Sequence, residues 1–180
     1  MRLTYVAVTA LALACIKPTS SATTASTAPS PSPVFKAILS RYVDGKARLV
    51  VENTTTRVSR EISTAPEKYR GLINEKTPDC GDRSTIDDAI SDMLKNQTVA
   101  LPVTGPYDGS VEFVPFVATT SERYGVASAS PVGFDAHASV AIVCVDYPRA
   151  PLFGDFRCFV LERKASEIWK VRCEGAIGFY

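Results

Sequence analysis

The chain has 180 residues, of which 46% are hydrophobic, and it carries 20 Lys and Arg side chains against 19 Asp and Glu. The formal net charge of +1 leaves no basic excess, which argues against a nucleic-acid partner and against a polybasic membrane-binding patch. The part from Val34 to Tyr180 has the length of one ordinary domain.

The first predicted element is a signal peptide at residues 1–14. Arg2 supplies a positive charge, and the residues that follow it, 3–14, are uncharged and mostly apolar. A permanent membrane-spanning helix needs about 20 apolar residues. This stretch is therefore too short to span a bilayer, and its length is typical of the hydrophobic region of a signal peptide. We expect the protein to be exported and this segment to be removed.

Cys15 follows the signal segment directly, and two kinds of peptidase could cut before it. Ala12-Leu13-Ala14 suits an ordinary signal peptidase. A lipoprotein peptidase could cut the same bond once Cys15 carries a lipid, although Ala12 stands where such sites usually have Leu. The chain has five cysteines, and unpaired thiols are uncommon in exported proteins. Lipidation of Cys15, or a cut further on such as after Ala22, leaves four cysteines to form pairs.

Residues 15–33 are rich in Ser, Thr, Ala and Pro, a composition that cannot bury a core and predicts a disordered tether. Such a tether is useful between a lipid anchor and a folded domain. We therefore expect Cys15 to be lipidated and to hold the protein at a membrane, in an extracytoplasmic compartment. A soluble periplasmic or secreted protein is the alternative.

The first half of the folded part predicts three helices and one strand. The first helix, 34–43, has apolar residues at helical spacing, namely Phe35, Ile38, Leu39 and Tyr42. A β-branched run predicts a strand over 47–54, and Pro66 suits the first turn of a short helix over 66–75. In the third helix, which ends near Lys95, Ser84-x-x-Asp87 resembles a capping box. Its apolar face consists of Ile86, Ala89, Ile90, Met93 and Leu94.

The second half predicts strands. They are expected at 111–120, 127–134, 139–147, 156–163 and 168–175, the last two forming a hairpin. Helices followed by a run of strands indicate an α+β fold, with N-terminal helices packed on an antiparallel sheet that ends in a C-terminal meander. We expect residues 34–180 to form a single domain.

Two motifs in this half carry a resemblance. Residues 130–135 read S-P-V-G-F-D, and residues 161–171 read L-E-R-K-A-S-E-I-W-K-V, with the strand 141–145 and Gly154 between them. In order they resemble an uncharacterised family of exported bacterial lipoproteins with an S-x-V-G-F-[ND] strand and a closing L-E-[KR]-x4-W-K-V hairpin, although five residues, 164–168, separate Arg163 from Trp169 in this chain. The chain departs from that pattern in its loop 148–155, which is not Gly-rich and has no Cys. The resemblance implies export and a similar fold, and it implies no activity.

The sequence points to no catalytic residue, cofactor or metal. His137 is the only His, and its D-A-H-A-S setting between two strands predicts an exposed turn, so neither a Cys–His pair nor a triad is expected. The cysteines lie at least 14 residues apart, which does not suit zinc. A cluster of aspartates has the wrong spacing for a calcium loop and suits helix capping and solvation instead; its members are Asp79, Asp82, Asp87 and Asp88. Trp169 is expected in the core.

Four cysteines are expected to form two disulfides. If residues 164–167 form a four-residue loop, Val160 faces Val171 and Cys158 faces Cys173. This register predicts a Cys158–Cys173 bridge and leaves Cys80 to pair with Cys144. In a competing register, Cys144 faces Cys158 across the loop 148–155.

Two classes of function remain open. The first is a non-enzymatic binding or structural domain of the cell envelope, with a membrane as partner through the lipid anchor and an unidentified envelope protein or glycan as a further partner. The second is a hydrolase that uses a pair of carboxylates. The 19 acidic residues allow many such pairs, and the sequence gives no reason to choose one.

Overall fold

The computed structural model describes residues 29–43, 49–56, 80–103, 110–116, 124–150, 153–164 and 168–178. The predicted signal peptide, Cys15 and the predicted helix at 66–75 lie outside these ranges. The described elements, in chain order, are α1 (Ser32–Tyr42), β1 (Leu49–Glu52), α4 (Arg83–Lys95), η1 (Asn96–Thr98), β2 (Val111–Val114), β3 (Val126–Ala129), β4 (Gly133–Phe134), β5 (Val140–Ala150), β6 (Phe153–Arg163) and β7 (Trp169–Gly178).

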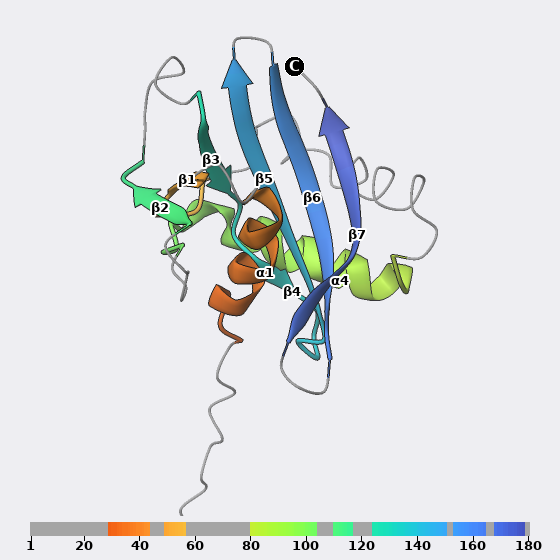
Figure 1. The fold of residues 1–180 in the computed structure, drawn as a ribbon. Helices are drawn as coiled ribbons and strands as arrows, with labels where there is room; N and C mark the ends of the chain where they lie inside the picture. Colours follow the sequence, from red (N-terminus) through yellow and green to blue (C-terminus); the bar gives the residue numbers. More distant parts are fainter. Residues whose placement is uncertain are drawn as a thin grey trace, which may run out of the picture.

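One mixed sheet joins all the strands of the described part (Figure 1). Its order is β2-β1-β3-β5-β6-β7, with the short β4 also paired to β5. β1 runs parallel to both β2 and β3, whereas β5, β6 and β7 form the predicted antiparallel meander. The fold is α+β as predicted, but the sheet is not purely antiparallel. A long connection that includes α4 separates β1 from β2, and parallel strands need a connection of about a dozen residues or more.

The two helices cover opposite faces of the sheet, so α4 does not belong to an N-terminal helical layer (Figure 1). Because side chains alternate along a strand, β5 directs Ala141, Val143 and Val145 to the α1 side and Ile142 and Cys144 to the α4 side. Both helices present the predicted apolar faces to these two cores. The buried residues are Val34, Phe35, Ile38 and Leu39 in α1, and Ile86, Ala89, Ile90 and Met93 in α4.

The cap of α4 lies two residues before the predicted one. Asp82 is the N-cap residue, and its carboxylate accepts hydrogen bonds from Thr85 N at 3.2 Å and Thr85 Oγ1 at 3.1 Å, as well as from the Ser84 hydroxyl. These hydrogen bonds, led by the one from Ser84, hold the pKa of Asp82 below its usual value. Ser84 therefore assists the cap but does not form it.

The predicted strand at 127–134 is two strands, β3 and β4, with a break at Ser130–Val132. Pro131 has no N–H to donate to a ladder. Ser130 replaces the missing pairing: its N–H donates to Cys144 O at 2.8 Å, and its hydroxyl oxygen accepts from Cys144 N at 2.9 Å.

The disulfides are Cys80–Cys173 and Cys144–Cys158, so the predicted pairing is wrong and the competing register holds for Cys144. Cys144 and Cys158 lie opposite each other on β5 and β6, with Cα atoms 4.0 Å apart. Cys158 faces Gly175 on β7, and Cys173 faces Val160. Both bonds are of the kind found in oxidising, extracytoplasmic compartments.

Two departures from the expected hairpin explain the error. Arg163 pairs with Trp169, not Ile168, so the loop is one residue longer than predicted. A bulge between the Leu161–Val171 and Val160–Cys173 pairs then adds Arg172 as an unmatched residue. The bulge reverses the side-chain alternation, so that Trp169 and Val171 pack on the α1 side while Cys173 points to α4.

Candidate functional site

The motif at 130–135 leads the chain beneath α4. At its centre, Gly133 lies against the helix backbone: an added Cβ would stand 2.0 Å from Ala89 O and 2.4 Å from Met93 N. No side chain fits in that space. Gly133 is therefore required for close packing of α4 on β4.

The two motifs that carry the family resemblance meet in the core. The rings of Phe134 and Trp169 lie 5.7 Å apart between centroids, and Trp169 is buried as predicted. The guanidinium of Arg163 lies over the Trp169 ring at 5.9 Å. The backbone N–H of Phe134 donates to Asp92 Oδ2 at 3.0 Å, which ties the first motif to α4.

Asp135 organises the turn between β4 and β5. Its carboxylate accepts hydrogen bonds from the N–H groups of Ser139 and Val140, both at 2.6 Å, from the Ser139 hydroxyl at 2.9 Å and from His137 N at 3.3 Å. Burial alone would raise the pKa of Asp135, but these donors, led by Val140 N, hold it below its usual value. His137 is exposed in this turn, as predicted. The motif residues thus have structural roles.

An open groove of about 960 Å³ lies beside this turn. One wall is the segment Pro29–Ser32, which leads into α1. A second is the C-terminal half of α4, and the floor is apolar, formed by Leu101, Pro102, Val132 and Phe134. Volumes of about 300–1,000 Å³ and a mostly apolar lining are typical of sites for small molecules.

The rim of the groove is unevenly charged. Three carboxylates, those of Asp88, Asp92 and Asp135, line it together with one ammonium group, that of Lys95. From the sequence, Asp88 is expected to serve in capping and solvation, and Asp92, Lys95 and Asp135 are not expected to be site residues. The available signal was the spacing of Asp88, Asp92 and Lys95 at i, i+4 and i+7, which places them on one stripe of α4.

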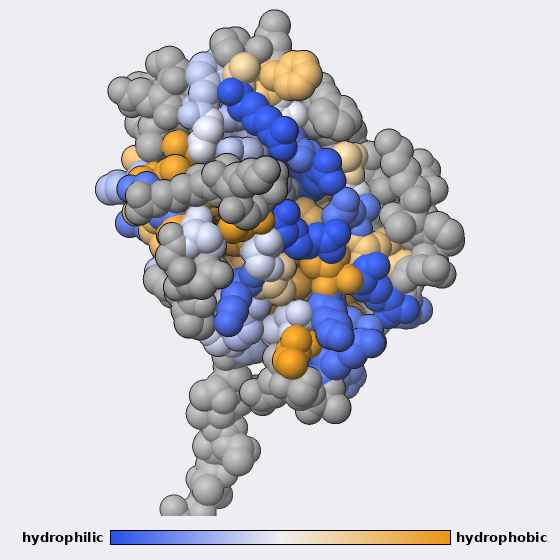
Figure 2. All heavy atoms as spheres, in the orientation of Figure 1, coloured by the Kyte–Doolittle hydropathy of each residue, from blue (hydrophilic) through white to orange (hydrophobic). Residues whose placement is uncertain are grey.

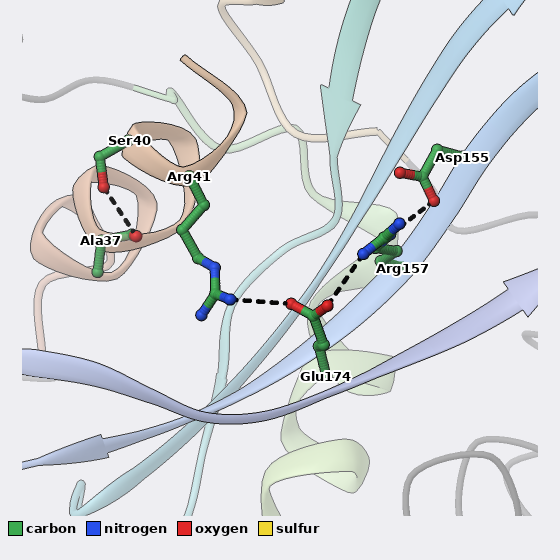
Figure 3. Close-up of polar contacts among 6 residues, drawn as sticks. All are labelled: Ala37, Ser40, Arg41, Asp155, Arg157 and Glu174. Atoms are coloured by element: carbon green, nitrogen blue, oxygen red, sulfur yellow. Dashed lines mark hydrogen bonds and ion pairs between the residues drawn. The ribbon is translucent and has the colours of Figure 1, made fainter. Parts of the chain in front are cut away.

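A second polar cluster fastens α1 to the other face of the sheet (Figure 3). Arg157 Nε lies 2.7 Å from Asp155 Oδ1 and its Nη1 lies 2.9 Å from Glu174 Oε1, while Arg41 Nη2 reaches Glu174 Oε2 at 3.3 Å. The hydrogen bond to Asp155 is the main cause that raises the pKa of Arg157. Both strands β6 and β7 are thereby linked to the last turn of α1.

The Tyr42 hydroxyl is buried and has no hydrogen-bond partner within the described part of the chain. Burial, and after it the negative charge of Asp155, raises the pKa of Tyr42. The hydroxyl therefore stays protonated. The Tyr42 ring packs edge-on against Phe159 and Tyr147, at 6.0 and 6.2 Å between centroids, which indicates a packing role for this side chain.

Apolar side chains on the face that carries α1 appear at separate places among hydrophilic ones (Figure 2). The large hydrophobic residues that are most exposed, Phe153 at 70% and Phe116 at 57%, belong to different strand regions, β6 and the end of β2. Scattered apolar residues of this kind need no functional explanation. The groove is therefore the better candidate site.

Within the described residues, no helix is long and apolar enough to cross a membrane, and no three His, Cys, Asp or Glu side chains are grouped as metal ligands would be. No protein-family model, curated protein or solved structure matches the chain.

Proposed function

We propose that the protein is an exported, non-enzymatic binding domain, held at a membrane through lipidated Cys15, and that its ligand occupies the groove beside Pro29–Ser32. The observation that carries the proposal is the groove itself, with an apolar floor and a volume of about 960 Å³. The two disulfides support export.

The position of the groove fits the proposed anchor. Pro29–Ser32, which form one of its walls, belong to the segment 15–33 whose composition suits a tether. The ligand site would then lie at the end of the domain from which the anchor leads away. The resemblance to exported lipoproteins, which implies export, supports the same reading.

The hydrolase alternative has less support. A general acid works best when its pKa is raised toward the working pH. Asp135, the carboxylate of the groove that accepts most hydrogen bonds, has a pKa that is lowered, and its donors hold a turn in place. Asp92 is likewise engaged by Phe134 N.

The anchor is tested by intact-mass analysis of protein extracted from membranes. We expect a mature chain that begins at Cys15 and carries the added mass of its lipid. A soluble product that begins near Thr23 would show that Cys15 is discarded with the signal peptide.

The groove is tested with three probes that share one apolar body, the phenylbutyl group: 4-phenylbutylammonium, 4-phenylbutanol and 5-phenylpentanoate. Each is titrated into the isotopically labelled mature protein, and backbone amide shifts are followed by NMR. We expect at least one probe to shift the amides of Leu101, Val132 and Phe134. If no probe shifts them, the groove is not a ligand site and the proposed function fails.

A further inference from the structure

We propose that the groove selects a small organic cation, an ammonium or guanidinium group joined to an apolar body. The inference rests on the proposed function, because it specifies the ligand of the same groove. It combines the apolar floor with the sign of the charge on the rim.

The negative charge of the rim is not neutralised from within. Lys95 forms no ion pair with the described residues, so its ammonium does not occupy the carboxylates of Asp88 or Asp92. Asp88 is exposed and forms no hydrogen bond or ion pair within the described part of the chain. Its charge is available to a ligand.

The other two carboxylates are held in place by the fold. Asp92 Oδ2 accepts from Phe134 N at 3.0 Å, and Asp135 is fixed by the donors of its turn. An ionised carboxylate has about four acceptor sites, so Asp92 keeps capacity for a further donor. Charges that are already fixed do not have to be ordered when a ligand binds, which favours binding.

The apolar floor of the groove determines the second part of the ligand, its apolar body. Val132 is buried and Phe134 is half-buried, and with Leu101 and Pro102 they line the same groove as the carboxylates with apolar surface. A ligand with a cationic end and an apolar body satisfies both parts of the groove. An anion of the same shape would meet like charges, which discriminates against it.

The three phenylbutyl probes measure this selectivity directly, because they differ only in the head group. We expect the ammonium to bind at least tenfold more tightly than the alcohol and the carboxylate to bind most weakly. The preference for the ammonium should shrink as salt is added, because exposed charges are screened.

Two variants should change the affinity for the ammonium probe in opposite directions. Asp88→Asn should weaken binding of the ammonium probe about three- to fivefold, as expected for the loss of an exposed charge pair. Lys95→Gln should strengthen its binding by a similar factor. Affinity for the alcohol should stay unchanged in both variants, which a merely structural effect would not produce.

Equal affinity for the ammonium and the alcohol, or tighter binding of the carboxylate, would overturn the inference while leaving the groove a ligand site. The same holds if Asp88→Asn and Lys95→Gln shift ammonium affinity in one direction. The absence of any groove shift with all three probes is the separate result that removes the proposed function.

Discussion

At Gly133 the backbone of β4 lies against the backbone of α4, and the contact leaves no room for a methyl group. We expect Gly133→Ala to lower the free energy of unfolding by about 3 kcal/mol or more, because the added Cβ meets backbone atoms that cannot rotate away. Urea unfolding measures the loss.

Gly125 provides the matched control for that substitution. It has φ +84°, but an added Cβ would meet nothing within 4 Å. Gly125→Ala should therefore cost only the backbone strain of a left-handed residue, about 1–2 kcal/mol. Equal losses in the two variants would show that close helix packing is not the reason for glycine at 133.

The hydrogen-bonded carboxylate of Asp135 predicts how the stability of the protein depends on pH. An Asp in an unfolded chain has a pKa of about 3.9, and the hydrogen bonds of the turn lower the pKa of Asp135 in the folded protein. Its stabilising contribution is therefore fully present above about pH 4 and is lost as the pH falls through the lower folded value. The stability difference between wild type and Asp135→Asn should be largest near neutral pH and should shrink below pH 4, as measured by urea unfolding. A difference that stays constant down to pH 3 would contradict this role.

The ion pairs that connect the end of α1 with β6 and β7 differ in how far their side chains are buried. The side chain of Asp155 is 10% exposed, whereas those of Glu174 and Arg157 are 36% and 34% exposed. Arg157→Met leaves the Asp155 carboxylate without this partner, and we expect a loss of about 2–3 kcal/mol, reduced from the value for a fully buried pair by solvent screening. Glu174→Gln should cost less than about 1 kcal/mol. Thermal unfolding of both variants checks the order, and a larger loss for Glu174→Gln would show that the contact with α1 matters more than burial of Asp155.

Helical periodicity predicted α1 and α4 together with their buried faces, because tertiary packing and local pattern agree there. The β5–β6–β7 meander was also predictable from its apolar runs. The register of β6 with β7 was not: the sequence carries no clear sign of the bulge at Arg172 or of the longer loop before Trp169. Since one residue of slip moves every side chain to the other face, the disulfide pairing failed with the register.

Across the whole molecule, the parallel pairing of β1 with β2 and β3 could not be read from the sequence, because it depends on contacts between segments far apart in the chain. The groove was missed for the same reason. It brings together Pro29–Ser32, the end of α4 and the turn after β4. None of these segments has a binding motif of its own, and only the folded sheet places them side by side.

The proposed site is tested most directly by closing the groove with a single side chain. Ser91 lines the groove, is exposed on α4 and donates its hydroxyl to Asp87 O at 2.8 Å. Ser40 on α1 is the matched control, because it is also exposed and its hydroxyl donates to Ala37 O at 3.0 Å (Figure 3). Unlike Ser91, it does not line the groove. Both can be changed to Trp without entering the core. We predict that Ser91→Trp abolishes binding of 4-phenylbutylammonium, measured by NMR titration, and that Ser40→Trp binds it as the wild type does. Unchanged binding in a folded Ser91→Trp variant would contradict the assignment of the groove as the ligand site.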